Sequence, residues 1–124
     1  MTDQPFLPYG RHAIDEGDIT TLVEVLRGDW LTCGPMVPRF EEALARQTGA
    51  RHGVALSSGT AALHLAALAL ELGPGDGVVV PAMTFLATAN AARFVGAEVI
   101  FADVNPATGL LGLADFQAAL ERAP

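Results

Sequence analysis

Three hydroxyl side chains and a glycine stand together in the segment SSGT (57–60), between a short apolar run and a long pattern rich in Ala and Leu. A helix that begins here would present free N–H groups and the positive end of its dipole to an anion. Glycine lets the backbone approach such an anion closely, and hydroxyl groups can donate further hydrogen bonds. The segment therefore predicts a phosphate site, unless Ser58 or Thr60 serves only to cap the helix.

The other residue types that often act in catalysis or metal binding do not form a recognisable site in this sequence. His12, His52 and His64 lack the spacing of metal ligands, so we expect no metal site. Cys33 lies in a turn without an evident activating base, and we expect no nucleophilic role for it. All seven basic residues are arginine, so no lysine side chain can act as an amine nucleophile. We expect no catalytic residue in this chain.

Composition narrows the class of protein. The chain has 124 residues, 51% of them hydrophobic, and a net charge of −7, which suits one folded core. Its arginines are scattered rather than clustered, so we expect no nucleic-acid partner. The apolar stretch 61–72 is too short to span a bilayer, and the N-terminus does not resemble a signal peptide. The single cysteine adds to the expectation of a cytoplasmic protein without a membrane partner.

Hydrophobic spacing predicts two helices in residues 1–52. The first begins near Asp15 and carries an apolar stripe that ends with Trp30. In the second, Val37, Phe40 and Leu44 mark a buried side, and Gly49 ends the helix. We expect residues 1–52 to form an N-terminal helical segment.

Strands and helices alternate in residues 53–124. We expect strands at 53–56, 78–80 and 97–102, with helices at 60–72, at 84–94 with Thr84 as its cap, and around Phe116, Ala119 and Leu120. This order predicts an α/β domain with a mainly parallel sheet and helices on both faces. Three strands make a thin sheet, so we expect the chain to be the first part of a larger protein.

Several further motifs occur in a characteristic order and spacing. They are PYGR (8–11), IDE (14–16), DWLTCGP (29–35), FE (40–41), SGTAAL (58–63), GPGD (73–76), PAMTF (81–85), ATAN (87–90) and FADV (101–104). With these motifs the sequence resembles the DegT/DnrJ/EryC1/StrS family of sugar aminotransferases that depend on pyridoxal phosphate. It is most similar to the branch that acts on UDP-4-keto-6-deoxy sugars in pseudaminic acid synthesis.

The resemblance implies the first βαβαβα part of the large domain of a fold-type I transferase, normally a homodimer. It implies that Ser58, Gly59, Thr60 and Ala61 bind the cofactor phosphate and that Phe85 stacks on the pyridine ring. It places Thr32 and Gly34 near a nucleotide-sugar substrate, with glutamate as the expected amino donor. The lysine and aspartate that the family uses at the cofactor lie farther along the family chain than this sequence reaches.

Two alternatives remain open at this level. The chain could be a complete small protein that binds a phosphorylated ligand without catalysis. It could also be a dinucleotide-dependent enzyme, although the glycine spacing of a pyrophosphate loop is missing.

Overall fold

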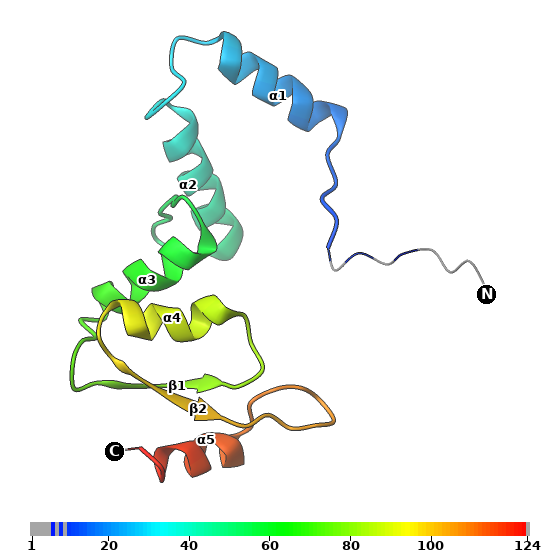
Figure 1. Ribbon diagram of the computed structural model, residues 1–124. Helices are drawn as coiled ribbons and strands as arrows, with labels where there is room; N and C mark the ends of the chain where they lie inside the picture. The colour runs from blue at the N-terminus through cyan, green and yellow to red at the C-terminus, as the bar shows by residue number, and fades with distance from the viewer. Residues whose placement is uncertain (1–5, 7, 9, 124) are drawn as a thin grey trace. The chain divides into compact units, whose positions relative to one another are not determined.

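The computed structural model describes residues 6, 8 and 10–123, in two compact units, Met1–Ala55 and Leu56–Pro124 (Figure 1). The first unit contains helices α1 (Glu16–Arg27) and α2 (Met36–Thr48). The second contains α3 (Gly59–Ala69), β1 (Gly77–Pro81), α4 (Leu86–Phe94), β2 (Glu98–Ala102) and α5 (Leu113–Leu120). None of the helices in the described residues is long and apolar enough to cross a membrane.

Helix α1 begins where the sequence predicts. The Asp15 carboxylate accepts the amide of Asp18 at 3.0 Å, and the Asp18 carboxylate accepts the amide of Asp15 at 3.1 Å. This reciprocal pair satisfies two amides that the helix itself leaves free, and its charges suit the helix dipole. The predicted apolar stripe is not buried, however, since Leu22, Leu26 and Trp30 are all more than half exposed.

Helix α2 ends as predicted, because Gly49 adopts a left-handed conformation with φ of 72° at its C-terminus. The prediction that one side of α2 is buried is wrong for the unit that the structure describes. Val37, Phe40 and Leu44 keep 45%, 57% and 41% of their surface exposed, because no element in this part of the chain covers them.

The predicted strand at 53–56 does not form. A strand exists through its ladder of backbone hydrogen bonds, and no described segment supplies that ladder here. The amide of Ala55 instead donates to the carboxylate of Glu41 at 2.8 Å. Gly53 lies so close to α2 that a Cβ atom would stand 2.5 Å from the carbonyl oxygen of Glu41. The segment is therefore attached to helix α2 rather than to a sheet.

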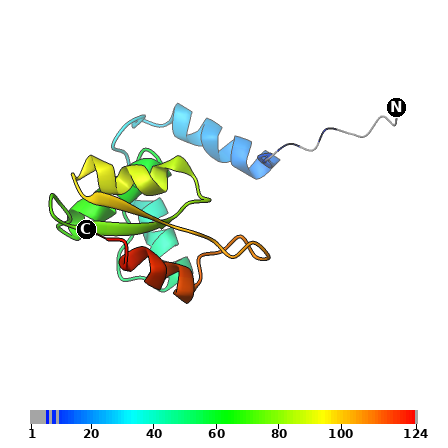
Figure 2. The ribbon, with the colours of Figure 1, turned by 60° about the horizontal axis from the view of Figure 1, so that its bottom comes forward.

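The second unit is a parallel α/β arrangement. Strands β1 and β2 pair in parallel, with Val79 opposite Ile100, and α4 is the crossover between them. Helix α4 packs on one face of the strands, α5 lies on the other face, and α3 packs against α4 (Figures 1 and 2). Helices on both faces of a parallel sheet confirm the predicted architecture, with two strands instead of three.

The core of this unit consists of small side chains. Its buried residues are Ala67, Val80, Ala87, Ala89, Ala92, Ala97, Ala102 and Ala119. Small residues let the helices approach the strands closely, but they remove little apolar surface from water. On α5 only Ala119 of the predicted inner side is buried, while Phe116 and Leu120 stay 38% and 48% exposed.

Candidate functional site

Helix α3 begins with a side-chain cap. Ser58 has extended backbone angles, its Oγ accepts the amide of Ala61 at 3.2 Å, and its carbonyl accepts the amide of Ala62 at 3.0 Å. Ser58 therefore satisfies one of the amides that the first turn leaves free. Ser58 therefore caps the helix, as one of the two interpretations of this segment predicts, and the amide of Ala61 already donates to its side chain.

Two further amides remain at the start of α3. The amides of Gly59 and Thr60 donate to no group in the part of the chain that the structure describes, and both residues are exposed. A Cβ atom built on Gly59 would meet nothing within 4 Å. Ser57 and Thr60, which carry hydroxyl groups, are exposed as well. The start of α3 thus offers several donors next to open space.

Charge at this helix start favours an anion. The first turn of α1 carries Glu16 and Asp18, whereas the first turn of α3 carries no acidic residue. No carboxylate in the first turn of α3 therefore neutralises the positive end of its dipole. Together with the free amides, this donor set fits a phosphate group.

Phe85 immediately precedes helix α4. Figure 1 shows α3 and α4 starting at the same end of the unit, the end toward which β1 points. Phe85 occupies the N-cap position, its carbonyl accepts the amide of Thr88 at 3.0 Å, and its side chain is 77% exposed. The predicted cap at Thr84 is wrong, because α4 has no side-chain cap and the hydroxyl of Thr84 lies 3.1 Å from that of Thr88. Asn90 is half-buried farther along α4.

The turn at 29–35 contains Thr32 and Gly34, the two residues predicted to lie near the substrate. Thr32 is exposed, and a Cβ atom on Gly34 would lie 2.7 Å from the Cβ of Trp30. The glycine is thus needed for the tightness of the turn. Neither Thr32 nor Gly34 lines the pocket beside this turn.

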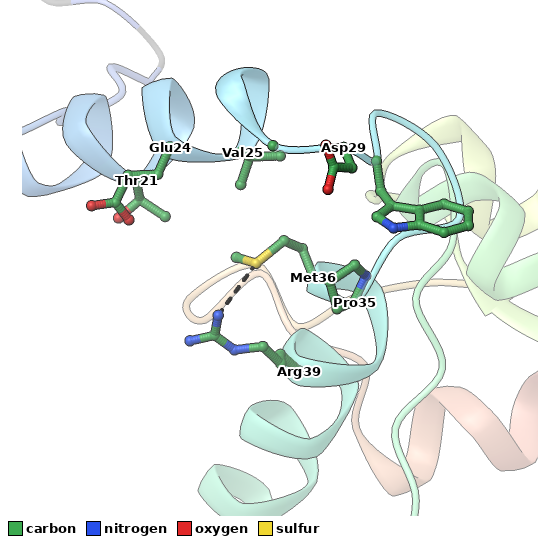
Figure 3. A pocket seen from close by; sticks show the side chains of 9 residues that line it. Thr21, Glu24, Val25, Asp29, Pro35, Met36 and Arg39 are labelled. Atoms are coloured by element: carbon green, nitrogen blue, oxygen red, sulfur yellow. Dashed lines mark hydrogen bonds between the residues drawn. The ribbon is translucent and has the colours of Figure 1, made fainter.

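That pocket, of about 320 Å³, lies between α1 and α2 in the first unit (Figure 3). Its lining residues are Thr21, Glu24, Val25, Gly28, Asp29, Trp30, Pro35, Met36 and Arg39. Arg39 donates to the sulfur of Met36 at 3.5 Å. Sequence reasoning did not select Glu24 or Arg39, because they come from separate helices and share no motif. Within the described residues, no three His, Cys, Asp or Glu side chains gather as a metal site would require.

The fold places the chain among parallel α/β proteins, and the start of α3 suits an anionic ligand. The sequence matches the model of the DegT/DnrJ/EryC1/StrS aminotransferase family over residues 12–123. The chain belongs to this family.

Relatives and solved structures agree with this assignment. The UDP-4-amino-4-deoxy-L-arabinose–oxoglutarate aminotransferase of Shewanella sediminis is 49% identical over 100 residues, which are 81% of this chain and 26% of that protein. A Streptococcus pneumoniae protein described as a sugar aminotransferase, in its pyridoxal phosphate form, superposes with a TM-score of 0.84 at 37% identity, over 91% of this chain and 29% of the other. For 3-amino-5-hydroxybenzoic acid synthase the TM-score is 0.78 at 37% identity, with 86% and 28% of the two chains covered.

These likenesses confirm the expected fold class, part of a fold-type I α/β transferase. The family depends on pyridoxal phosphate, and the Streptococcus pneumoniae protein was also solved in its pyridoxamine phosphate form. The chain spans about a quarter of the length of these relatives.

Proposed function

We propose that this chain is the part of a pyridoxal-phosphate-dependent sugar aminotransferase that binds the cofactor phosphate. The observation that carries the proposal is the start of α3, where the amides of Gly59 and Thr60 are free, no acidic side chain is present and the space beside Gly59 is open. Membership of an aminotransferase family supports the choice of cofactor.

The phosphate site would be formed by Ser58, Gly59, Thr60 and Ala61, which would have different roles. The amides of Gly59 and Thr60 would donate to its oxygens, the hydroxyl of Thr60 would add a donor, and Ser58 would keep the turn in shape through its bond to Ala61. Ala61 would contribute its own amide only if it shared it between Ser58 and the phosphate. The exposed ring of Phe85 would cover one face of the pyridine.

The bound cofactor would supply an electron sink for the transfer of an amino group. The family attaches it to a lysine, and this chain has none. The chain's own contribution is therefore to bind and orient the cofactor, and we expect the chain by itself to show no transaminase activity.

The substrate would be a keto-sugar linked to a nucleotide, with glutamate as the amino donor. The name of the Shewanella sediminis relative contains a UDP-linked amino sugar and oxoglutarate, the keto acid that glutamate becomes when it gives up its amino group. We place the sugar near the turn at 29–35, where Thr32 and Gly34 follow the pocket residue Trp30. We further propose that the complete enzyme belongs to the branch that acts on UDP-4-keto-6-deoxy sugars.

Three further proposals complete this assignment. We propose that residues 1–52 are an N-terminal helical segment and residues 53–124 the start of the large domain. We also propose that the complete enzyme is a homodimer, as the family resemblance implies, and that it acts in the cytoplasm.

The test is the binding of pyridoxamine 5′-phosphate, which carries an amine instead of an aldehyde and therefore needs no lysine. We expect the chain to bind it in equilibrium dialysis, and to bind pyridoxamine, which lacks the phosphate, at least about tenfold more weakly. Thr60→Val should weaken binding. The control Thr20→Val, which removes only a 2.7 Å bond to the carbonyl of Glu16 in α1, should not. Equal binding of the two ligands would contradict the proposal.

The same loop also favours a second candidate, a protein that binds phosphorylated ligands without catalysis. This candidate predicts that inorganic phosphate and simple phosphate esters bind as tightly as pyridoxamine 5′-phosphate and that Phe85→Ala changes nothing. The aminotransferase proposal predicts that pyridoxamine 5′-phosphate binds more tightly than inorganic phosphate or simple phosphate esters. It also predicts that Phe85→Ala removes this difference.

A further inference from the structure

We propose that the hydroxyl pair of Thr84 and Thr88 is a positioning device that orients Phe85 toward the cofactor ring. The inference rests on the proposed function, because it concerns the ring that would cover the pyridine. It assigns a role to two residues that neither belong to the phosphate loop nor contact the phosphate in the proposal above.

The first observation is that packing does not hold the Phe85 ring. Its side chain is 77% exposed, and its neighbours Met83 and Leu86 are 63% and 69% exposed. A ring without packed neighbours keeps its rotamer freedom, and a ligand that stacks on it must restrict that freedom. The direction of the ring therefore depends on how the backbone at Phe85 is fixed.

The second observation is that the usual device for fixing this backbone is missing. Phe85 is the N-cap residue of α4, and its side chain cannot accept an amide of the first turn. The bond that spans this position joins the Oγ1 atoms of Thr84 and Thr88 at 3.1 Å, and the amide of Thr88 donates to the carbonyl of Phe85 at 3.0 Å. Phe85 is thus enclosed by two bonds that both end on Thr88.

The third observation is that Thr88 belongs to the firmly packed part of α4. Its neighbours Ala87 and Ala89 are buried, while Thr84 is exposed. At the other end of the connecting segment, the amide of Ala82 donates to the carbonyl of Ala102 at 2.8 Å and continues the ladder of β1 and β2. Between these two fixed points, the hydroxyl pair is the side-chain bond that the structure records.

The consequence is a selective effect on ring binding. Removal of the Thr84 hydroxyl should free the backbone at Phe85 and leave the start of α3 unchanged. We expect Thr84→Val to weaken the binding of pyridoxamine 5′-phosphate about twofold to tenfold, and to leave the binding of inorganic phosphate unchanged. Thr84→Ser, which keeps the hydroxyl, should restore binding.

A double-mutant cycle tests the coupling to the ring. Dissociation constants for pyridoxamine 5′-phosphate are measured for the unsubstituted chain, Thr84→Val, Phe85→Ala and the double variant. The inference predicts that Thr84→Val has no further effect once Phe85 is alanine, whereas a general loss of stability would weaken binding in both backgrounds. Thr88→Val breaks the same bond from the other side and should reproduce the effect, which provides a second variant if Thr84→Val does not fold.

The outcomes separate the two proposals. If Phe85→Ala weakens binding and neither Thr84→Val nor Thr88→Val does, the positioning role is wrong and the stacking role stands. An equal loss from Thr84→Val with and without the Phe85 ring also overturns the positioning role. If Phe85→Ala itself has no effect, the stacking role in the proposed function fails, and the positioning role fails with it.

Discussion

Replacement of Gly59 by alanine separates folding from binding more cleanly than other changes at the start of α3. A Cβ atom at this position meets no atom within 4 Å, and Gly59 does not adopt the left-handed conformation that favours glycine. Gly59 is also the first residue of α3, where alanine is a better helix former than glycine. We therefore expect Gly59→Ala to leave the free energy of unfolding unchanged or to raise it by about 0.5 kcal/mol.

The same substitution should weaken the binding of pyridoxamine 5′-phosphate. If the phosphate occupies the open space beside Gly59, the added methyl group takes up part of that space and hinders the approach of an oxygen to the amides of Gly59 and Thr60. Loss of one charge-assisted hydrogen bond, about 1.5 to 3 kcal/mol, corresponds to roughly tenfold to a hundredfold weaker binding. Urea unfolding followed by circular dichroism measures the first effect, and dialysis against pyridoxamine 5′-phosphate measures the second.

Gly10→Ala is the matched control, since a Cβ atom at Gly10 also meets nothing within 4 Å and the residue lies outside the phosphate loop. It should change neither quantity. If Gly59→Ala binds the ligand as tightly as the unsubstituted chain, the open space beside Gly59 is not the phosphate site.

Two further substitutions test local structure. Ser58→Ala removes the acceptor of the Ala61 amide and should lower the free energy of unfolding by about 1 kcal/mol in urea, whereas Ser58→Asp should preserve it. An unchanged unfolding midpoint for Ser58→Ala would show that the cap contributes nothing. Glu41→Ala leaves the partly buried amide of Ala55 without its acceptor and should lower the same quantity by about 1 to 2 kcal/mol. Its neighbour Glu42 makes only an exposed ion pair, so Glu42→Ala should stay within about 0.5 kcal/mol, and equal effects of the two variants would refute this assignment.

The sequence predicts best those features that depend on neighbouring residues. The start of α1 follows from Asp15 and Asp18, and the end of α2 follows from Gly49, because each device acts within one turn of the helix. The alternation of strands and helices after residue 76 predicts the parallel pair β1 and β2, since a helical crossover is the usual connection between parallel strands.

Features that need a distant partner are predicted poorly. The apolar run at 53–56 has the composition of a buried strand, but composition cannot supply the ladder that a strand requires. The same holds for burial, because the spacing of Phe40 or Phe116 shows which side of a helix is apolar without showing what covers it. The pocket that contains Glu24 and Arg39 was missed for this reason too, since it exists only where two helices come together.

The most direct test of the central claim is a titration of the isotopically labelled chain with pyridoxamine 5′-phosphate, followed by the backbone amide resonances. The account predicts saturable shifts that are largest for the amides of Gly59 and Thr60, and inorganic phosphate should reproduce these shifts at higher concentration. Saturable binding that leaves these two amides unmoved, or the absence of any binding, would contradict the assignment of the start of α3 as the phosphate site.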